Sequence, residues 1–300
     1  DPDDINTYLG GKAGNRFYSR GKVKDGDWDL DSGKFKGWDI HQAIHDHYLR
    51  NVPWSETRYY KRALAHLKHE KLLRGENDID AIFKRIEILH DSILANGLKS
   101  MKEWPEIDGA HWETLDKFAS HDDITVSIDR DGRFMLQDGK HRLSITKLLQ
   151  LKSIPVAVGF RHKKWVDFRN EIQSFCNKRG SAYQPFTHPD LQDFPVHHDD
   201  KREKDIEDKI PNKPGSLLDL GSYFGYFCCY FSKIGWKCTA VEHHKIHSYF
   251  IRRLADAEDL NINVLTMSLF EIPDREFDVV LALNIFHHYL KTKDLFNQLT

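Results

Sequence analysis

The chain has 300 residues, which is more than one ordinary hydrophobic core accommodates, so we expect two domains. Its 40% hydrophobic and 30% charged residues are typical of a globular protein, and no run approaches the roughly 20 apolar residues of a membrane span. A formal net charge of −2 argues against a general affinity for nucleic acid, and four cysteines without CxxC spacing predict reduced thiols in a cytoplasmic protein, with no metal site.

The N-terminal region is predicted to be mainly helical. Residues 1–37 are rich in Gly and Asp and are expected to be mostly irregular. Three helices follow, over residues 39–49, 56–73 and 80–96. Ser55 is placed to cap the second helix, and Gly97 is a natural stop for the third.

A strand-rich segment comes next. Ile124, Val126 and Ile128 alternate with polar residues, and the Asp131-Gly132 pair predicts a hairpin turn before a returning strand at 134–137. A helix at 140–151, a buried strand at 154–160 and a helix at 163–179 complete a domain over residues 1–180. Prolines and a charge run then predict a solvated linker or short connecting helix at 181–213.

The strand-to-helix junction at residues 138–142 carries the chemistry of the N-terminal half. Asp138-Gly139-Lys140-His141-Arg142 gathers two cations and the backbone N–H groups of a helix start, which suits a phosphate. Arg142 can grip two oxygens at once, whereas Lys140 acts as a movable point charge. An ordinary helix start with surface cations is the alternative.

The surrounding pattern resembles the ParB/sulfiredoxin fold over residues 80–162. It comprises Glu87 within Ile-Glu-x-Leu, Asn96-Gly97-Leu98, the 138–142 motif and Ile154-Pro155-Val156. The resemblance implies an α+β domain that binds ATP or another nucleoside triphosphate with Mg²⁺ through Gly139, Lys140, His141 and Arg142. It also implies Asp138, His141 and Glu87 as catalytic candidates. His141 can instead be a core-facing histidine.

The sequence lacks the characteristic residues of two branches of that family, the sulfiredoxins and the partition proteins. Lys140 stands where sulfiredoxins carry their reactive cysteine, and the Gly-Glu-Arg-Arg motif of partition proteins is absent from the sequence. The motif Asp138-Gly-Lys-His-Arg142 resembles the small-molecule kinase branch, which includes free serine kinases. This likeness favours phosphorylation of a hydroxyl group.

The C-terminal part, from residue 214, is predicted to begin with a strand, a glycine-rich turn and a helix. Asp219 lies in a short apolar strand at 216–220, and Gly221 and Gly225 allow a sharp turn and a close approach to a ligand. A second strand at 237–241 ends at Glu242, a carboxylate suited to ribose hydroxyls. Further strands are predicted at 263–266 and 277–283, and the last leads to Asn284.

These motifs resemble class I methyltransferases. The resemblance implies a Rossmann-like, doubly wound sheet, incomplete because only four of about seven strands are predicted, over residues 214–300. It implies S-adenosylmethionine as cofactor, with Asp219, Gly221 and Gly225 in its motif, Glu242 at the ribose and Asn284 on the methyl-transfer side. Tyr223 stands where a third glycine often occurs.

The two resemblances together predict an α/β protein with two transferase activities. The leading interpretation is a bifunctional modifying enzyme, an ATP-type kinase for a glycan or small-molecule hydroxyl fused to a methyltransferase. The alternative is a methyltransferase regulated by a nucleotide-sensing ParB-like module without phosphotransfer. A nucleic-acid methyltransferase with a DNA-guiding module is a third interpretation, which the near-neutral charge disfavours.

One more cluster, Gly26-Asp27-Trp28-Asp29, places two acids around an aromatic ring. Such a group suits a sugar or a metal, but a tight turn with a packed Trp28 is the simpler interpretation.

Overall fold

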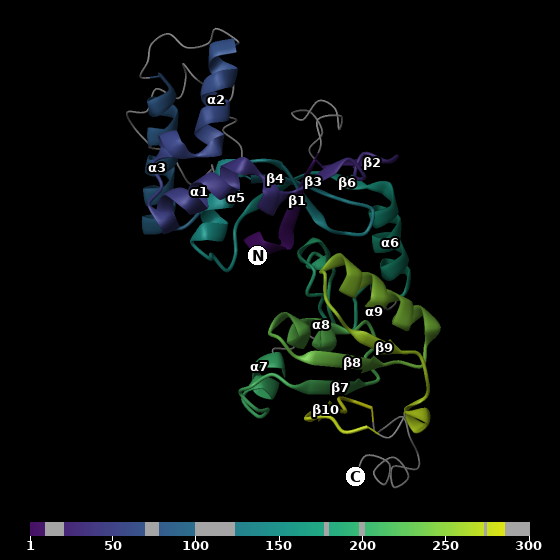
Figure 1. Ribbon diagram of the computed structural model, residues 1–300. Helices are drawn as coiled ribbons and strands as arrows, with labels where there is room; N and C mark the ends of the chain where they lie inside the picture. The colour runs from purple at the N-terminus through teal and green to yellow at the C-terminus, as the bar shows by residue number, and fades with distance from the viewer. Residues whose placement is uncertain are drawn as a thin grey trace. The chain divides into compact units, whose positions relative to one another are not determined.

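The computed structural model describes residues 1–9, 21–69, 78–99, 124–176, 180–197, 202–272 and 275–285 (Figure 1). The chain forms two compact units, Asp1–Trp165 and Val166–Thr300, so the division falls earlier than the expected boundary at residue 180. The predicted segment Phe286–His288 lies outside the described residues.

The first unit is built on a six-stranded mixed sheet in the order β2-β6-β4-β5-β1-β3. β4 and β5 form the predicted antiparallel hairpin, and its turn is confirmed by Gly132, which has a φ of 98°. β4 pairs in parallel with β6, and β1 pairs in parallel with β5. The strands are β1 Ile5–Leu9, β2 Lys22–Lys24, β3 Ser32–Lys34, β4 Ile124–Ile128, β5 Phe134–Asp138 and β6 Val156–His162.

Three of these strands lie in residues 1–37, where irregular structure was expected. That expectation is wrong for β1, β2 and β3. β2 and β3 have only three residues each, too few to show an alternating pattern. β1 is held by pairing with β5, whose residues lie far along the chain, so no local signal marks it.

Helices α1, α2, α3 and α5 gather into one apolar cluster in the first unit. Ile40, Ile44, Phe83, Ile93 and Ile145 are almost fully buried within it. The helices are α1 Asp39–Arg50, α2 Arg58–His69, α3 Asp78–Asn96 and α5 Lys140–Leu148, with 3-10 turns η1 Pro2–Asp4, η2 Phe35–Gly37 and η3 Trp54–Glu56.

The start of α2 differs from the prediction. Ser55 lies within the 3-10 turn η3, and the hydroxyl of Thr57 instead accepts a hydrogen bond from the N–H of Tyr60 at 3.2 Å. The cap therefore lies two residues later than expected, and the helix begins at Arg58.

The second unit contains a four-stranded, all-parallel sheet in the order β10-β7-β8-β9. Successive residues Leu217 and Leu218 of β7 belong to different apolar clusters, as expected for a strand covered on both faces. The elements are β7 Ser216–Leu220, α8 Tyr226–Lys233, β8 Lys237–Val241, α9 Lys245–Ala257, β9 Asn263–Leu265, η6 Leu269–Glu271 and β10 Val279–Leu281. The division between the units falls within α6 Lys163–Ser174.

Residues 180–197 pack as part of the second unit, although a solvated linker was expected there. Phe186, Leu191 and Phe194 are buried, and the Phe186 ring stacks on Phe224 with centroids 6.1 Å apart. Among the described residues between 180 and β7, the only named elements are η5 Pro189–Leu191 and α7 Arg202–Glu207.

Candidate functional sites

The motif at 138–142 forms the junction between β5 and α5. Gly139 has a φ of 96°, and a Cβ there would lie 3.0 Å from the Cα of Ile124, so both conformation and space require glycine. One carboxylate oxygen of Asp138 accepts a hydrogen bond from the Gly139 N–H at 2.7 Å. The structure thus brings Asp138, Gly139, Lys140 and Arg142 together at one helix start.

His141 is turned toward the helical layer. Its Nε2 lies 3.1 Å from the Tyr59 hydroxyl, and burial, reinforced by the charges of Lys140 and Arg142, lowers the pKa of His141 to about 3. The imidazole is therefore neutral near pH 7. A neutral ring can donate or accept one hydrogen bond at each nitrogen but adds no positive charge to a phosphate site.

Lys140 extends over an aromatic surface at the same junction. Its Nζ lies 5.8 Å from the ring centroid of Trp38 and 5.5 Å from that of Tyr59. Both distances are within the range of cation–π attraction, which orients the ammonium group without neutralising it.

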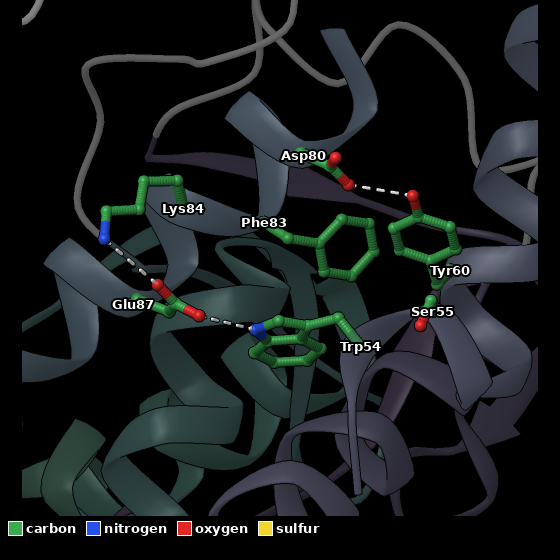
Figure 2. Close-up of a pocket in the computed structure, with 7 residues that line it drawn as sticks. All are labelled: Trp54, Ser55, Tyr60, Asp80, Phe83, Lys84 and Glu87. Carbon is green, nitrogen blue, oxygen red and sulfur yellow. Dashed lines mark hydrogen bonds and ion pairs between the residues drawn. The ribbon is translucent and has the colours of Figure 1, made fainter. Parts of the chain in front are cut away.

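Glu87 lies in a pocket of about 320 Å³ between η3, α2 and α3 (Figure 2). Its Oε1 accepts a hydrogen bond from the Trp54 indole at 3.0 Å, and its Oε2 lies 3.6 Å from Lys84 Nζ. Tyr60 donates a hydrogen bond to Asp80 at 2.8 Å at the other end. The Phe83 ring lies between these pairs, and the rings of Trp54 and Tyr60 carry their donor groups.

The Gly26–Asp29 cluster is held by Arg130. Asp29 accepts three bonds from Arg130, at 2.6 Å and 2.8 Å from the guanidinium and at 3.0 Å from its backbone N–H, while Asp27 accepts one at 2.8 Å. Burial alone raises the pKa of Asp29, but the Arg130 bonds outweigh it and the net pKa is lowered. Trp28 packs on Phe160 with centroids 4.7 Å apart. These contacts agree with a tight turn and a packed Trp28.

In the second unit, the glycine-rich turn after β7 is fixed to the end of β8. The N–H groups of Gly221 and Ser222 donate to the Val241 carbonyl at 2.9 Å and 3.1 Å. Gly221 and Gly225 have φ angles of 71° and 80°, and a Cβ on Gly225 would lie 2.9 Å from Ile251. Glycine at 225 is therefore needed for the packing of α8 against α9.

Tyr223 also adopts the left-handed conformation, with a φ of 54°. For a non-glycine residue this costs about 1–2 kcal/mol. Its ring stacks on Phe224 with centroids 3.9 Å apart and meets the edge of His247 at 4.8 Å. These contacts hold the strained residue in place.

Glu242 lies at the carboxyl end of β8, as the sequence predicted, and is almost fully buried. Its two oxygens accept hydrogen bonds from the N–H groups of Tyr223 at 3.0 Å and His244 at 2.8 Å. Burial raises the pKa of Glu242, but His247 and these N–H donors outweigh it, so the net pKa is lowered. The group is therefore an anion with lone pairs left for hydroxyl donors, which fits the ribose of a nucleoside.

Asp219 lies beneath the turn and is only 3% exposed. Its carboxylate lies 3.9 Å from the Cys228 thiol, and its carbonyl accepts the Ser222 hydroxyl at 2.8 Å. Burial, and next the charge of Glu242, raises the pKa of Asp219 to about 7. Its contacts are with the turn and α8.

Asn284 follows β10 and adopts a left-handed φ of 55°. Its amide donates to the Tyr183 hydroxyl at 3.1 Å, and the Tyr183 ring meets the edge of Tyr223 with centroids 5.6 Å apart. Tyr183 was not predicted from the sequence. It lies in the presumed linker, and no local pattern connects it to either partner.

Neither a metal cluster nor a membrane helix is found in the described part of the chain. No group of three or more His, Cys, Asp or Glu side chains is placed there to hold a metal ion. No helix there combines the length and apolar character needed to cross a bilayer.

One family model matches the C-terminal part of the second unit. Residues 218–300 match a family model described as a methyltransferase domain, so the chain carries such a domain, which implies S-adenosylmethionine as methyl donor. A comparison with curated proteins finds no match.

Solved structures resemble parts of the chain. The bifunctional kinase-methyltransferase WbdD is 21% identical, covering 44% of this chain and 32% of its own, with a TM-score of 0.38. The PH0226 protein of Pyrococcus horikoshii is 20% identical, covering 32% of this chain and 42% of its own, with a TM-score of 0.29. This chain therefore spans about a third of the WbdD structure.

Proposed function

We propose that this chain combines two transferase activities. The first unit would transfer a phosphoryl group from ATP or another nucleoside triphosphate to a hydroxyl of a glycan or small molecule. The second would transfer a methyl group from S-adenosylmethionine. An acceptor could then receive both groups in succession.

The geometry at the start of α5 carries the phosphotransfer proposal. Gly139, a position that no other residue type fits, immediately precedes α5, and Lys140 and Arg142 lie in the first turn of this helix. The N–H groups of a first helical turn, together with flanking cations, are the elements that bind phosphates. Since His141 is neutral, the positive charge for the phosphates comes from Lys140 and Arg142.

The proposed chemistry uses few protein groups. The acceptor oxygen attacks the γ-phosphorus, the bond between that phosphorus and the β–γ bridging oxygen breaks, and the nucleoside diphosphate leaves. A carboxylate takes the hydroxyl proton. Asp138, at the phosphate-binding helix start, is the first candidate and Glu87 the second; Asp138 accepts the Gly139 N–H and Glu87 the Trp54 indole N–H, so each keeps lone pairs for the proton. Mg²⁺ arrives with the nucleotide phosphates and needs few protein ligands.

In the second unit, this chain's residues would position the methyl donor. Glu242 would accept the ribose hydroxyls, and the turn at Gly221 would lie along the methionine part. Asn284, held by Tyr183, would border the reacting side. When bound, S-adenosylmethionine supplies a methyl group on a positively charged sulfur.

The test of phosphotransfer is incubation of the full chain with each γ-labelled nucleoside triphosphate, Mg²⁺ and a panel of sugars and small alcohols. We expect labelled acceptor from the native chain, nucleotide binding weakened at least tenfold in Lys140→Ala, and full binding in Lys152→Ala, an exposed lysine after the same helix.

Two carboxylate variants separate the kinase from the sensing module. In a kinase, Glu87→Gln or Asp138→Asn abolishes turnover while nucleotide still binds. If nucleotide binds but no acceptor is labelled under any condition, the phosphotransfer proposal fails and the sensing module is favoured.

A further inference from the structure

The pocket beside Glu87 has a polar pair at each end and the Phe83 ring between them (Figure 2). At one end Glu87 is fixed by Trp54 and faces Lys84; at the other Asp80 is fixed by Tyr60. Both carboxylates are thus held by aromatic donors and keep lone pairs for a ligand.

The spacing of the pairs suits a small ring. Asp80 and Glu87 are seven residues apart on α3, which corresponds to about 10.5 Å along the helix axis. Phe83 lies between them on the same helical face. A six-membered sugar ring has this form, with hydroxyls at its edges and an apolar C–H face.

The charges indicate what kind of group binds at each end. Two carboxylates repel a phosphate, so the pocket does not suit the nucleotide. The gap of 3.6 Å between Glu87 Oε2 and Lys84 Nζ exceeds a normal hydrogen bond. A hydroxyl can donate to the carboxylate and accept from the ammonium, whereas the protonated amino group of an amine ligand cannot accept from Lys84.

We propose that the pocket beside Glu87 binds a neutral sugar ring, one of whose hydroxyls lies between Glu87 and Lys84. This inference rests on the proposed phosphotransfer function and names its acceptor class. It also places Glu87, one of the two candidate carboxylates for the hydroxyl proton, in the acceptor pocket.

Saturation-transfer NMR on the full chain tests the pocket without any turnover. The probes are methyl α-D-glucopyranoside and methyl α-D-mannopyranoside, with glucosamine as the amine comparison. We expect transfer to the ring protons of a neutral hexoside, a loss of at least fivefold in Glu87→Gln and in Asp80→Asn, and no change in Asp91→Asn. Asp91 is an exposed acid on the same helix, with 79% of its side chain accessible.

Both pocket variants keep an oxygen that can accept the Trp54 or Tyr60 bond, and thermal melting verifies that they fold. The inference is overturned if neither hexoside receives saturation, if transfer survives in both pocket variants, or if glucosamine alone binds. Hexoside binding without labelled product leaves the pocket standing and counts against phosphotransfer. Labelled product from an acceptor other than a sugar, without hexoside binding, supports phosphotransfer and overturns the sugar pocket.

Discussion

Replacement of Asp219 by Asn should stabilise the second unit in a pH-dependent manner. Burial raises the pKa of Asp219 from its ordinary 3.8 to about 7, so the folded protein holds a proton that the unfolded chain releases. Since each pKa unit corresponds to about 1.4 kcal/mol, the ionised carboxylate destabilises the fold by up to roughly 4 kcal/mol above pH 7. For a raised carboxyl pKa, stability falls as pH rises from about 4 to about 7.

Asparagine has no charge to bury, so its advantage over Asp219 should shrink on acidification. We expect the difference in opening free energy between variant and native chain to fall by about 2–3 kcal/mol from pH 8 to pH 5. Hydrogen exchange of peptides from β7 and α8, compared between the two proteins at each pH, measures it locally. Asp256→Asn, an exposed acid on α9, is the control. An equal difference at both pH values would refute the reasoning.

Three further predictions concern the two units. Glu242→Gln removes charged hydrogen bonds of about 1.5–3 kcal/mol, so calorimetry should show S-adenosylmethionine binding at least tenfold weaker; an unchanged Kd would contradict the ribose role. Tyr183→Phe keeps the ring but loses the Asn284 bond, so exchange after β10 should rise while the melting temperature stays constant; a lowered melting temperature would show that the hydroxyl stabilises the whole unit and not this segment alone. Asp29→Ala leaves the Arg130 guanidinium without its buried partner and should destabilise the first unit by roughly 3–5 kcal/mol in urea unfolding, and a loss below 1 kcal/mol would count against it.

Elements with a strong local signature could be predicted from the sequence. The short apolar run at 216–220 predicted a strand, and the structure has β7 there. The sequence also predicted the turn from Gly221 and Gly225, and the end of β8 from Glu242. These features could be predicted because each depends on residues that are neighbours in the sequence.

Features that depend on distant partners could not be predicted in this way. The strand β1 depends on its pairing with β5, and Tyr183 contacts Asn284 and Tyr223, which lie far along the chain. The segment 180–197 combines prolines with polar residues, which is typical of a linker, yet four of its apolar side chains are buried in the second unit. Composition does not reveal which apolar residues find a surface to cover.

The inner position of β1 has a practical consequence for anyone shortening this protein. Ile5–Leu9 lies between β5 and β3, so deleting the first nine residues would strip β5 of one neighbour and β3 of its partner. The exposed edge of β5 would then have unpaired N–H and C=O groups that can pair with a strand of another molecule, which promotes aggregation. Since β5 leads directly into Gly139, an expression clone trimmed at the amino end would also disturb the junction at residues 138–142.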